Sequence, residues 1–272
     1  MISRRFARLE LDDARVVFVE LLASAAAVLD DAPWWGGRPT GERIDGIDAE
    51  GRGARVRRRR APVDPSKILC VGRNYRAHAA ELGNPVPAEP LLFFKPPSSL
   101  VGADDAIELP PPALSQRVEH EAELGVVVGR RLRRASLEEA AAAVFGLTLV
   151  LDVTARDLQK KDGQWTRAKG MDTFCPVGPV VVTALDATEL VLRCHVSGEL
   201  RQQGSPRDMI FSIADVLAYA SQAMTLEPGD LVSTGTPEGV GPLVAGDRVA
   251  VTADAIGTLA LPVVASTPSA PP

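Results

Sequence analysis

Short apolar runs rich in β-branched residues recur along this chain, and turn-forming residues separate them. Runs of four to seven residues are typical of strands, whereas helices need longer periodic stretches. The chain's 23 glycines and 22 prolines can supply the many turns between them. We therefore expect a strand-rich α+β fold. The clearest predicted strands cover residues 67–71, 91–94, 124–128, 147–153, 177–182, 191–196, 230–234 and 248–252.

Three helices can be placed by their capping residues. Ser136 and Ser212 are each followed three residues later by an acidic residue, which is the capping-box pattern. They predict one helix from 137 to about 144, stopped by Gly146, and another from 213 to about 224.

The third helix is shorter. Asn74 can cap residues 75–82, and Gly83 can end them. His78 and Glu81 would then share one face, either as a working pair or as an exposed ion pair of little value. Residues 83–90 that follow are either the hinge of a mobile lid or a plain surface loop.

Composition excludes several classes of protein. The net charge is −5 and only 4% of residues are aromatic, which argues against a nucleic-acid binder. Three cysteines without CxxC spacing suggest neither a disulfide framework nor a thiolate zinc site. No apolar run approaches the roughly 18–20 residues that cross a bilayer, and the first residues do not resemble a signal peptide. We expect a cytoplasmic protein without a membrane or nucleic-acid partner.

The arginine-rich run at residues 55–60 divides the chain. It is either a local anion- or nucleic-acid-binding patch or a solvated strand edge or linker. Before it, residues 1–62 form a small N-terminal region with a strand-like start and a stretch, 17–29, that could be helical. After it we expect a main domain over 63–265 and a flexible tail over 266–272.

Carboxylates gather in two places. In the segment VEHEAEL at 118–124, strand alternation would put Glu119, Glu121 and Glu123 on one face. Such clustering is tolerated on a solvated edge or around a cation. Asp152 ends an apolar run and needs a partner, either Arg156 or a metal ion. Three carboxylates from two strands could hold Mg²⁺ or Mn²⁺ and leave positions for a chelating 2-oxo acid.

Six segments stand out in order along the chain: CVGRNY at 70–75, LFFKP at 92–96, EAEL at 121–124, DVTARD at 152–157, KGMDTFCP at 169–176 and STGTPEGVG at 233–241. Together they resemble the signatures of the fumarylacetoacetate hydrolase family. The match spans about residues 63–262 and implies a rolled mixed β-structure with a few helices. Residues 151–169 look most like the acylpyruvase and oxaloacetate decarboxylase branch, although Leu151 stands where many relatives carry Asn.

The resemblance implies a role for each matching residue. Glu121, Glu123 and Asp152 would ligate Mg²⁺ or Mn²⁺, while Glu119 would lie behind them or face solvent. His78 and Glu81 would activate water. The residues implied to contact substrate or to stabilise negative charge are Arg156, Gln159, Lys169 and Thr236.

The residues themselves leave alternatives open. Lys169 alone would be read as a solvated tip, and Lys95 either faces the pocket or extends to solvent. The loop at 235–241 lacks the ending of a Walker motif, so we expect a tight connection between strands whose N–H groups, including that of Gly235, could receive a carboxylate. Trp165 is expected in the core, and His120 and His195 are given no role.

These expectations combine into one leading function with alternatives. The leading one is a Mg²⁺- or Mn²⁺-dependent enzyme, a homodimer by resemblance, that hydrolyses the C–C bond of an acylpyruvate. The alternatives are decarboxylation or tautomerisation of oxaloacetate, isomerisation of 2-hydroxyhepta-2,4-diene-1,7-dioate or 5-carboxymethyl-2-hydroxymuconate, and a non-catalytic subunit that binds a metal and a carboxylate ligand.

Overall fold

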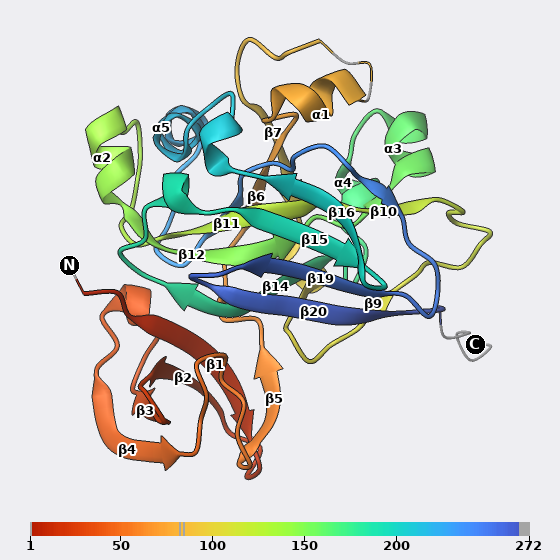
Figure 1. The fold of residues 1–272 in the computed structure, drawn as a ribbon. Coiled ribbons are helices and arrows are strands. Elements are labelled where there is room, and N and C mark those ends of the chain that lie inside the picture. Colours follow the sequence, from red (N-terminus) through yellow and green to blue (C-terminus); the bar gives the residue numbers. More distant parts are fainter. Residues whose placement is uncertain (1, 82, 84, 267–272) are drawn as a thin grey trace, which may run out of the picture.

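The structure is a computed structural model that describes residues 2–81, 83 and 85–266. Strands far exceed helices within these residues (Figure 1), which confirms the predicted strand-rich fold. None of the described helices is long and apolar enough to span a bilayer. Residues 267–272 of the predicted tail lie outside the described residues, as does residue 84 of the predicted lid, so both interpretations stay predictions.

The largest sheet has twelve strands. Its main path runs β4-β3-β2-β1-β14-β12-β11-β17-β6-β7, with β5 paired to β1 and β8 paired to β14. Most pairs are antiparallel, whereas β17 runs parallel to β6 and β8 runs parallel to β14. The strands are β1 (Arg5–Leu11), β2 (Val16–Leu21), β3 (Ala25–Leu29), β4 (Pro39–Asp45), β5 (Val56–Arg60), β6 (Ile68–Gly72), β7 (Leu91–Lys95), β8 (Leu100–Val101), β11 (Ala122–Val128), β12 (Val144–Leu151), β14 (Cys175–Val182) and β17 (Leu231–Ser233).

Two smaller sheets complete the β-structure. A five-stranded sheet in the order β16-β15-β19-β20-β9 packs on the first, and its Val251, Leu259 and Leu261 share one buried apolar cluster with Leu124 and Leu149. A three-stranded sheet, β13-β10-β18, lies where β11 begins and β12 ends. The strands are β9 (Ile107–Glu108), β10 (Val118–His120), β13 (Thr154–Ala155), β15 (Leu192–Val196), β16 (Glu199–Gly204), β18 (Gly241–Pro242), β19 (Arg248–Ala253) and β20 (Gly257–Val264).

The helices lie at the edges of the sheets (Figure 1). Both predicted capping boxes are formed, at Ser136 and at Ser212. The first helix ends at Ala142, two residues before the predicted end near 144, because the chain enters β12 at Val144. The helices are α1 (Arg76–Glu81), α2 (Leu137–Ala142), α3 (Arg156–Asp162), α4 (Thr166–Lys169) and α5 (Ile213–Ala223).

The predicted cap of α1 is wrong. The side chain of Asn74 donates hydrogen bonds to the carbonyls of Phe211 and Thr234 and accepts one from the Phe211 N–H. Asn74 is buried, and these long-range bonds satisfy its amide in place of a cap. It therefore connects the start of α1 to the segment before α5 and to the segment after β17.

The predicted helix over 17–29 is also wrong, because this stretch forms the hairpin of β2 and β3. β-Branched valines suit a pleated strand, and β1 offers a partner along the whole of β2. Pairing buries Val19 and Val28. Since β1 also pairs with β14, these strands continue the large sheet, and the division at residue 62 stays a prediction.

The arginine-rich run forms β5, the strand that one of its two interpretations predicted. Carboxylates meet its positive charge. Arg55 lies 3.7 Å from Asp12, Arg57 lies 3.5 Å from Glu10, and Arg60 also pairs with Glu10.

The loop after β8 supplies further carboxylates to this run. Asp104 pairs with Arg59 and Asp105 pairs with Arg58. Gly102 allows this approach, since a Cβ there would lie 2.4 Å from the Arg59 carbonyl oxygen. The loop is therefore packed directly against the backbone of β5.

Gly102→Ala should lower the free energy of unfolding by about 1–3 kcal/mol, because β5 and the loop must separate to admit a methyl group. Thermal and urea unfolding would measure the change. Gly241→Ala is the control, since its Cβ would meet only the ring of His120 at an ordinary 3.6 Å. Equal stability of the two variants would contradict the proposed close packing.

Candidate active site

Three carboxylates meet where β11 begins and β12 ends. The predicted single strand over 118–124 is interrupted at Glu121, between β10 and β11. The Asp152 N–H donates to the Glu121 carbonyl at 2.8 Å, so the end of β12 lies against this interruption. One carboxylate oxygen each from Glu121, Glu123 and Asp152 lie within 4.8 Å of one another, and all three side chains are buried.

Two buried lysines offset part of this negative charge. Lys169 donates to Glu121 at 2.8 Å, to Asp152 at 2.7 Å and to the Thr154 hydroxyl at 2.8 Å. Burial lowers its pKa, but the charges of Asp152 and Glu121 outweigh that effect and hold the pKa above the ordinary value. Lys95 pairs with the other oxygen of Asp152. Both ammonium groups are therefore fixed on the carboxylate cluster and neither reaches into solvent.

Glu123 has a different environment. The hydroxyl of Ser233 and the N–H of Gly235 donate to one of its oxygens, at 2.5 and 2.8 Å, and no cationic side chain among the described residues pairs with it. Burial, with the nearby charges of Asp152 and Glu121, raises its pKa well above the usual range of a glutamate. Glu123 is therefore the carboxylate of the cluster whose ionised form no cationic side chain among the described residues stabilises by pairing.

The donor set fits a hard divalent cation. Carboxylate oxygens are the ligands that Mg²⁺ and Mn²⁺ prefer, and a cation would supply the positively charged partner that Glu123 lacks. Glu121, Glu123 and Asp152 would hold the ion.

Arg156, the first residue of α3, connects the cluster to that helix. It donates to Glu119 at 2.7 Å, to Glu121 at 2.6 Å and to the side-chain oxygen of Gln159 at 2.6 Å. Glu119 is 2% exposed, so the alternative that it faces solvent is wrong. Burial would raise the pKa of Glu121, but Lys169 and Arg156 outweigh it and hold that pKa below the usual range.

His78 and Glu81 lie together on α1. The Nδ1 atom of His78 is 3.3 Å from the Glu81 carboxylate, and the His78 side chain is buried. The N–H of Gly239 donates to the other oxygen of Glu81 at 3.0 Å. The glycine-rich loop after β17 therefore helps to hold the pair in place.

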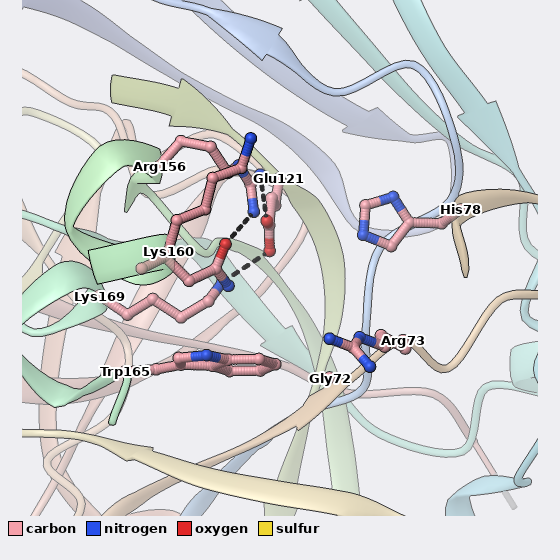
Figure 2. Close-up of a pocket in the computed structure, with 9 residues that line it drawn as sticks. Gly72, Arg73, His78, Glu121, Arg156, Lys160, Trp165 and Lys169 are labelled. Atoms are coloured by element: carbon pink, nitrogen blue, oxygen red, sulfur yellow. Dashed lines mark hydrogen bonds and ion pairs between the residues drawn. The ribbon is translucent and has the colours of Figure 1, made fainter. Parts of the chain in front are cut away.

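A cavity of about 260 Å³ lies between these groups. Figure 2 shows Arg156, Lys160 and Lys169 on one side of it, with Glu121, and His78 and Arg73 on the other. The sequence-predicted residues that line it are His78, Glu121, Arg156, Gln159 and Lys169.

Four other lining residues were missed: Gly72, Arg73, Lys160 and Trp165. Trp165 was expected in the core, but its ring forms one wall of the cavity and packs edge-on against Phe93. Arg73 stands inside a family segment, and Lys160 follows Gln159 directly. The position of Arg73 inside a motif and of Lys160 beside a predicted residue could have identified these two, whereas Trp165 lies in none of the six segments.

The remaining predicted residues lie behind the cavity lining. Lys95 contacts Asp152, the Gly235 N–H contacts Glu123, and the Thr236 hydroxyl donates to the Ala122 carbonyl at 2.8 Å. In this structure they support the carboxylate cluster. Their direct contact with substrate stays a prediction.

Comparisons with known proteins point to one family. The model of the fumarylacetoacetate (FAA) hydrolase C-terminal region matches residues 67–264. Oxaloacetate tautomerase YisK of Bacillus subtilis is 45% identical over 213 residues, which cover 73% of this chain and 70% of that protein. Mitochondrial oxaloacetate tautomerase FAHD1 of Arabidopsis thaliana is 46% identical over 190 residues, 68% of this chain and 84% of that protein.

A solved structure extends the similarity to nearly the whole chain. The 2-hydroxyhepta-2,4-diene-1,7-dioate isomerase from Mycobacterium marinum superposes with a TM-score of 0.85 and 40% sequence identity. The match covers 97% of this chain and 99% of that one, so it includes the N-terminal strands that precede the matched family region.

The affinity for Mn²⁺ should rise with pH. Without metal, Glu123 carries a proton between the ordinary glutamate pKa, about 4.3, and its own raised pKa, and an ion must displace that proton. Within this pH window, we expect the Kd for Mn²⁺ to rise by up to tenfold for each unit that the pH falls. Calorimetry in buffers of different ionisation enthalpy would measure about one proton released per ion, and a pH-independent Kd would contradict the assignment.

Glu123→Gln should weaken Mn²⁺ binding by at least 10- to 100-fold and remove its dependence on pH. Glu199→Gln is the matched control, because Glu199 is exposed and its carboxylate pairs with Arg201, away from the carboxylate cluster. An unchanged Mn²⁺ Kd in Glu123→Gln would exclude this residue as a ligand.

Proposed function

Because this chain belongs to the fumarylacetoacetate hydrolase family, we propose that it is a metal-dependent enzyme that interconverts the keto and enol forms of a small 2-oxo dicarboxylate. The observation that carries the proposal is the cavity, which brings Glu121 of the carboxylate cluster together with cations that have no acidic partner among the described residues. The relatives named as oxaloacetate tautomerases support this class of reaction.

Arg73 and Lys160 are the cations that favour a dicarboxylate. Neither forms an ion pair with a described residue, and the contact found for Arg73 is with the ring of Trp165, 5.9 Å away. Arg73 lies across the cavity from Lys160 (Figure 2). A substrate whose 2-oxo carboxylate end lies at the carboxylate cluster could therefore present a second carboxylate to these cations.

The carboxylate cluster supplies the other end of the site. A divalent ion held there would be chelated by the 2-oxo carboxylate and would acidify the adjacent C3 position. Lys169 and Arg156 add positive charge beside it. Since all three protons of the Lys169 ammonium group are donated to protein oxygens, this residue acts on the substrate through its charge.

Proton transfer is the work that we assign to His78. Glu81 holds a proton on Nδ1, so Nε2 keeps its lone pair and can act as a base. Nε2 would take a proton from C3, the C–H electron pair would form the C2–C3 double bond, the π pair of the C2 carbonyl would move onto its oxygen, and that oxygen would receive the proton back. The ring faces Glu121 and Lys169 across the cavity (Figure 2).

Hydrolysis of an acylpyruvate is the second candidate, and the same dyad favours it. His78 with Glu81 could activate water as readily as it could move a substrate proton. Gln159 accepts from Arg156 through its oxygen, which leaves its amide N–H groups for a developing oxyanion.

The deciding experiment follows oxaloacetate, acetylpyruvate and fumarylpyruvate by NMR, each with Mn²⁺, Mg²⁺ or EDTA. We expect metal-dependent exchange between keto and enol oxaloacetate without loss of total oxaloacetate. Cleavage of acetylpyruvate or fumarylpyruvate would replace the tautomerase proposal by the hydrolase, and release of CO₂ would replace it by a decarboxylase.

His78→Asn should lower kcat by about 10²- to 10⁴-fold and leave the Mn²⁺ Kd unchanged.

Lys160→Met should raise KM for oxaloacetate by about 3- to 10-fold, because the exposed lysine makes a modest charge-assisted contact with the second carboxylate. For a 2-oxo acid without that carboxylate, KM should not change. Lys161→Met is the matched control, since Lys161 lies one position along α3 and does not line the cavity. Equal effects of the two variants would contradict the role of Lys160.

A further inference from the structure

Gln202 lies on β16 and does not line the cavity. It nevertheless contacts two parts of the site, the β10–β11 segment and the glycine-rich loop after β17. Its side chain is 1% exposed. The carboxamide donates to the Thr236 hydroxyl and to the Pro237 carbonyl, each at 2.8 Å. It accepts from the Ala122 N–H and faces Nδ1 of His120, each at 3.0 Å.

These partners fix which end of the carboxamide faces which segment. The Ala122 N–H can only donate, so it must meet the oxygen of Gln202, and the Pro237 carbonyl can only accept, so it must meet the nitrogen. Nδ1 of His120 must then carry a proton. The amide therefore has one orientation that satisfies every partner.

Ala122 is the residue between two of the predicted metal ligands, Glu121 and Glu123. Its N–H donates to Gln202, and its carbonyl accepts from the hydroxyl of Thr236, which itself accepts from Gln202. The peptide groups before and after the Ala122 Cα are thus both held by one short chain of hydrogen bonds through Gln202 and Thr236, called the relay below.

The glycine-rich loop after β17 packs closely against β16. A Cβ on Gly239 would lie 2.0 Å from the Arg201 carbonyl oxygen, and one on Gly204 would lie 2.6 Å from Cβ of Pro237. The loop backbone therefore rests on β16 on either side of Gln202. This loop also supplies the N–H groups that donate to Glu123 and Glu81.

We propose that Gln202 is a positioning residue that sets the distance between the Glu121–Glu123 segment and the loop that carries Thr236. It acts through Thr236 and Ala122 and does not touch the substrate. The inference rests on the proposed function only for its activity readout, since its metal and amide-exchange readouts need no turnover.

Gln202→Glu isolates the contact with the loop. The carboxylate can still accept from Ala122 and His120, but it opposes the Pro237 carbonyl and can no longer donate to Thr236. We expect kcat/KM for the substrate found above to fall at least tenfold, with the Mn²⁺ Kd changed less than threefold. Gln203→Glu is the matched control, because the neighbouring Gln203 is exposed and contacts Arg193.

A double-mutant cycle separates positioning from a general loss of structure. In a Thr236→Val background the same Gln202→Glu change should cost less than threefold, because the relay is already broken, whereas in a Thr236→Ser background the full loss should remain. A loss of equal size in the Thr236→Val background, or wild-type kcat/KM in Gln202→Glu, would overturn the proposal.

Amide hydrogen exchange tests the relay without a substrate and without a folded Gln202 variant. The Ala122 N–H should exchange slowly in the wild-type protein and measurably faster in Thr236→Val, with Thr236→Ser close to wild type. Unchanged exchange of Ala122 in Thr236→Val would overturn the proposal even if no tested substrate were turned over.

Discussion

The placement of buried charge controls the architecture of this site. Glu121 and Asp152 share the ammonium group of Lys169, and Lys95 and Arg156 complete their pairing from β7 and α3. Burying such groups is costly unless each charge is met. The chain therefore has to deliver residues from distant segments to one point, and the large sheet does so by ending β12 and starting β11 side by side. Glu123 is left without a cation, and this deficit is what favours a divalent ion.

Much of this arrangement could be predicted from short-range patterns. The apolar runs located the strands of the main domain, the capping boxes located α2 and α5, and the ordered motifs identified the three carboxylates that the structure brings together. The N-terminal hairpin was mistaken for a helix, because its alanine-rich run has no clear alternation and only the pairing with β1 decides its conformation. Partners that are distant in the sequence leave no local signal.

The same reason explains the residues that were missed. Arg73 follows β6, whereas Lys160 and Trp165 belong to the α3–α4 region, and these segments meet only once the fold has closed. Gln202 was hidden in the same way, because its importance comes from four partners on three separate segments. Sequence motifs mark residues near the chemistry. They do not mark the side chains that hold those residues in register.

The rim and the floor of the cavity are built on different parts of the chain. Lys160 stands exposed on a short helix, where it makes no ion pair with a described residue, whereas the carboxylate cluster is locked into the sheet. A change at the rim therefore disturbs little packing, but a change at the floor disturbs several buried charges at once. Such a division makes the scaffold easy to diversify: a single accessible position at the rim can change while the buried carboxylate floor stays intact.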